Sequence, residues 1–280
     1  MPPEGLIRTP NAVVTASVID RARRELYVEG WTDVALILWL AGPTRDPHVL
    51  IAPISEVKME AQEGGEKGRL LALARTTQDE ARVICFVDAD HDRVLGISHP
   101  PNVVLTDGTD AEGYALEEQC ISRVLLLGVQ STKVSGQDVL DAVLGVAREI
   151  ALLRYVQRRY WKDLPVNSVR LTSVVKARHG QLAFDFAKLL RCVVSNCGGK
   201  PSLPEVLERL AEAKSELATV PDKDLVRGHD VMAILGEVLL GLKVCREDAP
   251  TIVRTAIDAG CLARNPNLDR IVRFVQGQSS

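Results

Sequence analysis

The sequence predicts an α/β protein in which a small, mostly parallel sheet is flanked by helices and followed by a mainly helical domain. Two observations predict this class. In the first half of the 280-residue chain, short apolar segments alternate with segments of helical periodicity, which is typical of a parallel sheet covered by helices. From about residue 112 onward, apolar residues recur at helical spacing and few strand signals remain. We therefore expect two domains, residues 1–130 and 131–280.

The expected elements of the first domain follow in chain order. Helices are expected at residues 13–24, 32–40 and 69–75, and strands at residues 25–29, 49–54, 83–87 and 102–106. The third strand is a near-continuous apolar run of the kind that is buried on both faces of a sheet. The glycine-rich stretch 64–68 is interpreted as a turn.

The second domain is expected to be mainly helical. Their apolar spacing places them at residues 139–158, 182–193, 203–217, 231–242 and 251–261. Ser202 and Glu205 fit a capping box at the start of one of them. No internal repeat is evident.

Composition and charge narrow the class of protein. The chain is 46% hydrophobic and 25% charged, with a net charge of −3, which argues against a protein that coats nucleic acid with its whole surface. No apolar run approaches the roughly 18 residues of a membrane span, and the N-terminus lacks a signal-peptide pattern. Six dispersed cysteines indicate reduced thiols. We expect a cytoplasmic protein with no membrane partner.

Acidic residues end two of the expected strands. Glu29 follows the first strand, and Asp88, Asp90 and Asp92 follow the third at alternate positions. Parallel sheets place functional groups at the carboxyl ends of their strands. Grouped carboxylates are costly to bury unless a cation compensates them, and Mg²⁺ (or Mn²⁺) prefers such oxygen ligands. The alternatives are an ordinary strand-to-helix turn at Glu29 and a solvated acidic loop after the third strand.

These segments carry a family resemblance. Val28-Glu29-Gly30, and later Asp88-Ala89-Asp90, resemble the signature of the TOPRIM domains of topoisomerases, primases and OLD-type nucleases. The match is closest to the stand-alone TOPRIM effector nuclease of PARIS-type anti-phage systems. Further segments that resemble this subgroup are residues 88–96, residues 102–107 with Leu116-Glu117-Glu118, and Val226-Arg227-Gly228-His229-Asp230.

The resemblance implies a Rossmann-like TOPRIM sheet and Mg²⁺-dependent cleavage of RNA or DNA in anti-phage defence. It also implies an ABC-type ATPase partner, and it leaves a homodimer open. Glu29, Asp88 and Asp90 would be the metal ligands and catalytic residues, with Asp92 and Glu117 as candidates for a second ion. Whether Glu29 is a ligand or a general base stays open.

Other polar residues have less defined roles. Asp33 is expected to cap or orient the site. Arg93 and Lys133 are the nearest candidates for a cation that stabilises the transition state. His179 and His229 are either structural or within reach of the site. The chain lacks the glycine-rich phosphate loop of ATPases, so a partner would supply any ATP hydrolysis.

A basic stretch in the second domain is a candidate nucleic-acid surface. It contains seven basic residues against one acidic residue, with aromatic residues interleaved. The basic residues are Arg154, Arg158, Arg159, Lys162, Arg170, Lys176 and Arg178. Basic side chains neutralise phosphates, and aromatic rings stack on unpaired bases. The alternative is a helix whose aromatic residues belong to the core and whose basic residues are merely solvated.

Two other classes of function stay open on the sequence. One is a non-catalytic TOPRIM-like binding module that keeps its acidic residues for structure. The other is a metal-dependent phosphatase or nucleotidyl transferase that acts on a small nucleotide. The choice between RNA and DNA, the number of ions and the activating trigger are not encoded in any motif that we identify.

Overall fold

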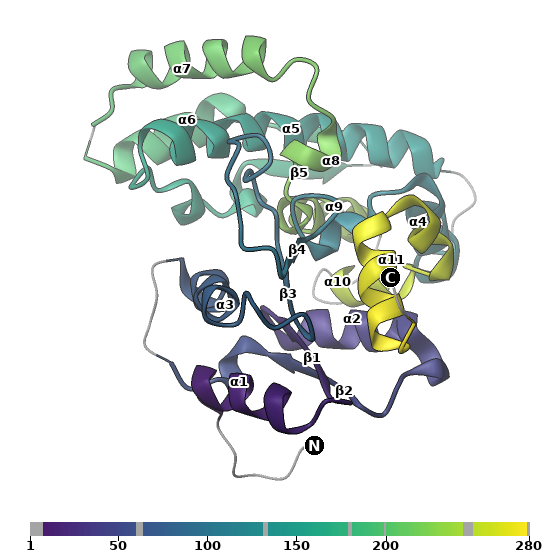
Figure 1. Cartoon of the computed structure of the whole chain (residues 1–280). Helices are drawn as coiled ribbons and strands as arrows, with labels where there is room; N and C mark the ends of the chain where they lie inside the picture. The colour runs from purple at the N-terminus through teal and green to yellow at the C-terminus, as the bar shows by residue number, and fades with distance from the viewer. Residues whose placement is uncertain are drawn as a thin grey trace. The chain divides into compact units, whose positions relative to one another are not determined.

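The computed structural model describes residues 8–59, 64–130, 134–178, 181–198, 200–242 and 249–278 (Figure 1). The chain divides into two compact units: unit 1 is Met1–Asp107 with Asp258–Ser280, and unit 2 is Gly108–Ile257. This division differs from the expected boundary near residue 130, because the chain leaves unit 1 earlier and returns to it at its end.

The return of the chain to unit 1 has a physical cause. The C-terminal helix α11 (Pro266–Val275) packs against α2 (Trp31–Ala41) and buries Leu268, Ile271 and Val272. Asp107, at the end of the first segment, caps this helix, because its carboxylate accepts hydrogen bonds from the backbone N–H groups of Asn267 (3.0 Å) and Leu268 (2.9 Å).

Unit 1 is built on a four-stranded sheet in which every neighbouring pair is parallel. The strands are β1 (Arg24–Val28), β2 (Val49–Pro53), β3 (Val83–Val87) and β4 (Val103–Leu105), in the order β2-β1-β3-β4. The α/β class with a parallel sheet is thus confirmed. All five residues of β3 are buried, as expected for a central strand covered on both faces.

Helices cover both faces of the sheet (Figure 1). The helices α1 (Pro10–Ile19) and α3 (Gly65–Thr76) bury apolar residues against Tyr27 and Val87. The helices α2 and α11 lie on the other face. Short 3₁₀ turns complete the unit at Gly42–Thr44, Ile54–Glu56 and Ala259–Arg264.

Two expected boundaries in unit 1 are corrected. The first helix ends at Ile19 rather than at residue 24, because Asp20 is extended and the chain turns into β1. The stretch 64–68 was expected to be a turn, but α3 begins within it. Gly64 is the N-cap with a φ of 89°, a conformation that glycine adopts without strain.

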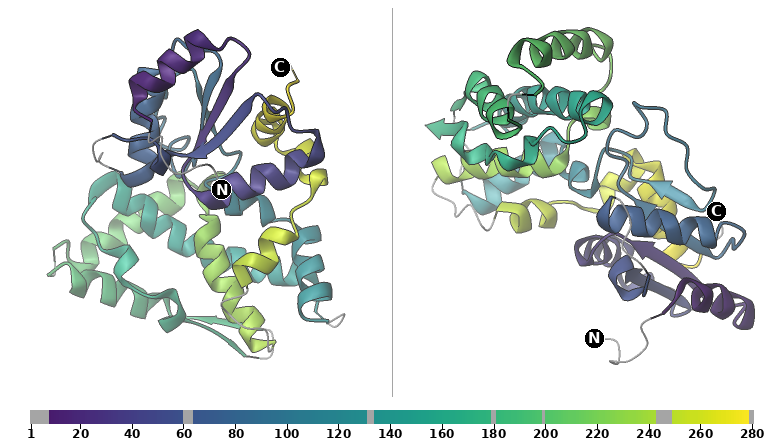
Figure 2. Two further views of the ribbon diagram at one scale, coloured as in Figure 1. Left: turned by 90° about the horizontal axis from the view of Figure 1, so that it is seen from below. Right: turned by 90° about the vertical axis from the view of Figure 1, so that its left-hand side faces the viewer.

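Unit 2 is mainly helical, and the long helix α5 runs through it (Figure 2). Its α-helices are α4 (Glu118–Arg123), α5 (Gly136–Tyr160), α6 (Phe186–Asn196), α7 (Leu203–Glu216), α8 (Asp222–Leu225), α9 (Gly228–Gly241) and α10 (Ala249–Thr255). A π-helical turn follows α4 at Val124–Gly128, and 3₁₀ turns lie at Ala111–Ala115, Val166–Ser168 and Leu171–Ser173. The capping box of Ser202 and Glu205 at α7 is confirmed.

Two of the expected helices in this half are corrected. Residues 182–193 were expected to form one helix, but β5 (Val175–Arg178) and β6 (Gln181–Phe184) form an antiparallel pair and α6 starts only after Asp185. Asp185 caps α6 by accepting a hydrogen bond from the Lys188 N–H (2.8 Å). The expected helix at 251–261 ends at Thr255.

Within the described ranges, no helix combines the length and the apolar character needed to cross a membrane. The five cysteines that lie in these ranges are free thiols, and Cys85, Cys120 and Cys261 are buried.

Candidate active site

The two acidic segments meet at the carboxyl edge of the sheet. Glu29 follows β1, and Asp88 follows the neighbouring strand β3. The backbone N–H of Asp88 donates a hydrogen bond to Oε1 of Glu29 at 3.0 Å. The next N–H, from Ala89, donates to Oγ1 of Thr106 after β4 at 2.9 Å. The loop that carries the aspartates is therefore held from both sides by the strands that flank β3.

The turn after Glu29 is fixed by Asp33. The backbone N–H of Gly30, the N-cap of α2, donates to Oδ2 of Asp33 at 2.9 Å. The Asp33 carboxylate lies in the first turn of α2, where the positive end of the helix dipole also favours it. This capping contact sets the direction in which the chain leaves Glu29.

Lys67 lies among the aspartates. Its Nζ is 2.6 Å from the Asp88 carbonyl oxygen, 2.7 Å from Oδ2 of Asp90 and 2.9 Å from Oδ2 of Asp92. Lys67 belongs to the first turn of α3, and its side chain is 13% exposed. The ammonium group thus occupies a point on which three oxygen atoms converge.

Sequence reasoning missed Lys67 because the glycines around it were interpreted as a turn. A signal was nevertheless present in the order of the elements. A helix that follows one parallel strand and precedes the next begins at the carboxyl edge of the sheet. Any basic residue in the first turn of that helix is a candidate for the site, and Lys67 is such a residue.

The loop between Asp88 and Asp92 is tightly folded. Asp90 has a φ of 46°, in the left-handed region that aspartate tolerates better than most residues other than glycine. The Asp92 N–H donates to the Ala89 carbonyl at 2.8 Å. The Asp92 side chain is 1% exposed, and Nε2 of His99 lies 3.0 Å from its Oδ2. The ammonium group of Lys67 thus compensates the buried carboxylate of Asp92, and the His99 ring lies beside it.

Burial raises the pKa of the Glu29 carboxyl to about 7. The hydrogen bond from Asp88 and the positive charge of Lys67 oppose this rise, whereas the negative charges of Asp90 and Asp33 add to it. Near neutral pH, Glu29 therefore exchanges a proton easily.

This shift predicts a pH-dependent stability. The pKa of Glu29 in the folded protein lies above its ordinary value of 4.5, so folded Glu29 keeps a proton that the unfolded chain has released. The contribution of Glu29 to the free energy of unfolding therefore falls as pH rises from about 4.5 to 7. When pH is raised from 5 to 8, we expect the free energy of unfolding of the Glu29→Gln variant to rise by up to about 3 kcal/mol relative to that of the parent. Urea unfolding of both proteins in a chelator measures this, and an equal difference at both pH values would contradict it.

The oxygen atoms around Lys67 suit a hard divalent cation in chemical type. They come from carboxylates and a backbone carbonyl, and Glu29 lies beside them. Among the residues that the structure describes, no three acidic, histidine or cysteine side chains are grouped closely enough to hold a metal ion as they stand. Glu29, Asp88, Asp90 and Asp92 would hold such an ion after the Lys67 ammonium moves aside.

The other residues that the sequence suggested for the acidic site make the following contacts or belong to other parts of the chain. Glu117 belongs to unit 2, where it is the N-cap of α4. The Arg93 guanidinium donates from Nη1 to the Asp107 carbonyl at 3.1 Å. Lys133 and His179 lie outside the described residues.

Arg154 does not belong to an exposed basic surface, and this corrects the sequence expectation. It is 8% exposed and forms a bidentate salt bridge with Asp230. Its Nε lies 2.5 Å from Oδ2 of Asp230, and its Nη2 lies 2.7 Å from Oδ1. Its Nη1 donates to Oδ1 of Asn167 at 2.6 Å. The apolar face of α5 carries Arg154 inward, so it supports the fold of unit 2.

The other residues of the basic stretch differ in how exposed they are. Arg159 is exposed but pairs with Glu216 at 2.5 Å, and Arg158 is half-buried. Tyr155, one of the interleaved aromatic residues, is buried in the core of unit 2. The side chain of Arg178 is outside the described part of the structure. Lys162, Arg170 and Lys176 are exposed as well.

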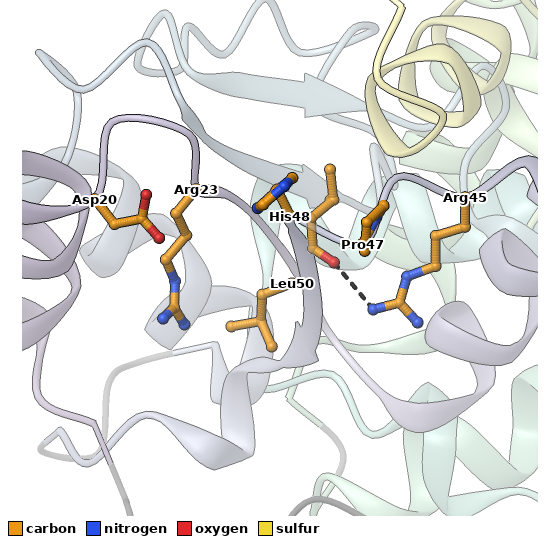
Figure 3. A pocket seen from close by; sticks show the side chains of 7 residues that line it. Asp20, Arg23, Arg45, Pro47, His48 and Leu50 are labelled. Carbon is orange, nitrogen blue, oxygen red and sulfur yellow. Dashed lines mark hydrogen bonds between the residues drawn. The ribbon is translucent and has the colours of Figure 1, made fainter.

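A hollow of about 260 Å³ lies at the opposite, amino-terminal edge of the sheet (Figure 3). Arg23, Arg45 and His48 contribute to its lining. Arg45 donates from Nη2 to the Val49 carbonyl at 3.0 Å, and Arg23 donates from Nε to Glu25 at 2.5 Å. These arginines hold the starts of β1 and β2, so we assign the hollow a structural role.

Comparison with known proteins found no family model and no curated protein that matches this chain.

Proposed function

We propose that the protein is a Mg²⁺-dependent nuclease of TOPRIM type that cleaves phosphodiester bonds in RNA or DNA. One observation carries the proposal: Glu29 accepts a hydrogen bond from Asp88 across two neighbouring strands, beside oxygen atoms that already surround a cationic group. The donor set is that of a hard cation, and it lies at the carboxyl edge of a parallel sheet, which is where folds of this class bind their ligands.

The residues of the site divide the chemistry between them. Glu29, Asp88 and Asp90 would hold the ion, and Asp92 would hold a second ion or orient Lys67. A bound divalent ion supplies an activated water and stabilises charge on phosphate oxygens. Lys67, displaced from the carboxylates, would lie close enough to offer its positive charge to the phosphate in the transition state. In the metal-free site the pKa of Glu29 is about 7, so the alternative role of Glu29 is proton transfer near neutral pH, with Asp88 and Asp90 holding the ion.

The proposed setting rests on the sequence resemblance. It is bacterial anti-phage defence in the cytoplasm, with an ABC-type ATPase partner and a homodimer as the proposed assembly. The exposed residues Lys162, Arg170 and Lys176 are the proposed contacts to the nucleic-acid backbone.

The position of Lys67 also favours a second candidate. An ammonium group that permanently replaces the cation would leave a non-catalytic binding module with the same fold. The two candidates differ in whether metal binding displaces the lysine.

The decisive experiment offers plasmid, single-stranded DNA and tRNA to the purified chain with Mg²⁺, Mn²⁺ or a chelator. We expect cleavage of at least one substrate, only when metal is present. If no nucleic acid is cleaved under any of these conditions, the nuclease is rejected. If Mn²⁺ also fails to bind, the result favours the binding module.

Lys67→Met tests the competition between ammonium and metal. Removing a charge at less than 3 Å from two carboxylates should strengthen Mn²⁺ binding by about tenfold. It should nevertheless slow cleavage, because the transition state loses a positive charge. Titration calorimetry and the cleavage assay measure the two effects, with the exposed Lys58→Met as the matched control. Equal Mn²⁺ affinity in parent and variant would show that the ammonium does not occupy the place of the ion.

A further inference from the structure

Unit 2 contains a cavity of about 400 Å³ that the proposed nuclease chemistry does not use. Its polar lining consists of Arg154, Asn167, Thr172, Arg227, His229 and Asp230. The cavity therefore combines two arginines and a histidine with one carboxylate.

The one carboxylate of the lining is already compensated. Both oxygens of Asp230 accept hydrogen bonds from Arg154, and this pair is buried. Asn167 uses its carbonyl oxygen to accept from Arg154, so its NH₂ group is the end that keeps donor capacity. With Asp230 paired to Arg154, the side chains of Arg227 and His229 add nitrogen donors to the lining. The positive charge of Arg227 also acts on the buried carboxylate of Asp110. Nitrogen donors outnumber free acceptors in the lining, and this favours an anionic ligand.

The backbone that carries Arg227 and His229 is rigidly anchored. Gly228 lies between them, and its N–H donates to Oδ1 of the buried Asp110 at 2.9 Å. The N–H of His229 donates to Oδ2 of the same carboxylate at 3.2 Å. A Cβ atom at position 228 would lie 2.4 Å from Oδ1 of Asp110 and 2.5 Å from the Gly113 nitrogen, so only glycine permits this approach. The two side chains thus project from a fixed turn.

The size and the remaining walls of the cavity restrict its ligand. Val169, Leu171 and Ala233 form an apolar part of the lining. A volume of about 400 Å³ lies at the small end of the range for ligand sites, well above what a phosphate ion needs and too small for a folded polynucleotide. An anionic group at one end and a flat or apolar group at the other would match both parts of the wall.

We propose that this cavity binds a small phosphorylated molecule of about the size of a mononucleotide. Arg227, His229 and the Asn167 amide would contact the phosphate, and the apolar wall would contact the remainder of the ligand. Arg154 and Asp230 would hold Asn167 in place. The lining shares no residue with the acidic cluster, so the proposal stands whether or not the chain is a nuclease.

The test measures binding of AMP, inorganic phosphate and adenosine to the full chain by titration calorimetry in a chelator, which removes metal-dependent phosphate binding. We expect AMP to bind more tightly than either fragment. Arg227→Gln and His229→Ala should each weaken AMP binding by about tenfold or more, because each removes a charge-assisted hydrogen bond. The exposed Arg191→Gln, on α6 and not part of the lining, is the matched control and should leave the affinity unchanged.

The outcomes separate the parts of the proposal. If Arg227→Gln lowers the thermal stability, the His229→Ala variant still decides, because its side chain is exposed and its backbone contact to Asp110 is kept. Unchanged AMP affinity in His229→Ala, or equal loss in Arg191→Gln, would reject the cavity as the site. Phosphate that binds as tightly as AMP would reject a mononucleotide-sized ligand, and no binding of any of the three compounds would overturn the proposal entirely.

Discussion

Exchanging Glu29 for glutamine or Asp88 for asparagine is expected to slow metal-dependent cleavage by about a thousandfold or more. A loss of this size corresponds to roughly 4 kcal/mol of transition-state stabilisation, which is what a displaced or weakly held ion would cost. Both exchanges keep the shape of the side chain. In the Glu29→Gln variant, the amide oxygen still accepts the hydrogen bond from the Asp88 N–H, so the fold of the loop should be preserved.

The measurement is the initial rate of cleavage on the substrate that the parent cuts, together with Mn²⁺ affinity and the thermal unfolding temperature. Asp79→Asn is the matched control, because Asp79 is an exposed acidic residue of the same unit. We expect this control to cleave like the parent. If Glu29→Gln and Asp88→Asn also cleave like the parent, the acidic cluster is not the catalytic site.

The position of the acidic residues at the carboxyl edge of the sheet could be predicted, because the sequence signals for it are local. The apolar run of β3 ends directly at Asp88, and the β1 segment ends directly at Glu29. Parallel pairing then places both acidic residues at the same edge, whatever the helices between them do. Helix boundaries were harder, because they depend on single capping residues. Asp20 ends α1 early, and Gly64 starts α3 before its apolar periodicity begins.

Features that depend on contacts between remote residues were not predictable. Lys67 reaches Asp90 only because α3 begins four residues earlier than its apolar pattern suggests. The return of α11 to unit 1 depends on the Asp107 cap, to which no local pattern points. Arg154 looked like a member of a basic stretch, and only the three-dimensional position of Asp230 shows why it is buried.

That buried pair gives the largest expected effect on stability. Asp230→Ala should lower the free energy of unfolding by about 3–5 kcal/mol, because it leaves the guanidinium of Arg154 buried without a compensating charge. Arg148, on the same helix α5, pairs with Asp222 nearer the surface, where the side chains are 28% and 37% exposed. Asp222→Ala is thus the matched control and should lower the free energy of unfolding by about 1 kcal/mol or less.

Urea unfolding followed by circular dichroism measures both variants, and the double variant Arg154→Met/Asp230→Ala completes the test. Because the cost of Asp230→Ala arises from an unpaired charge rather than from lost attraction alone, removing that charge should restore part of the stability. A double variant that is less stable than Asp230→Ala would mean that Arg154 contributes mainly through its contact with Asn167 and its packing within α5. Equal costs for Asp230→Ala and Asp222→Ala would contradict the role of burial.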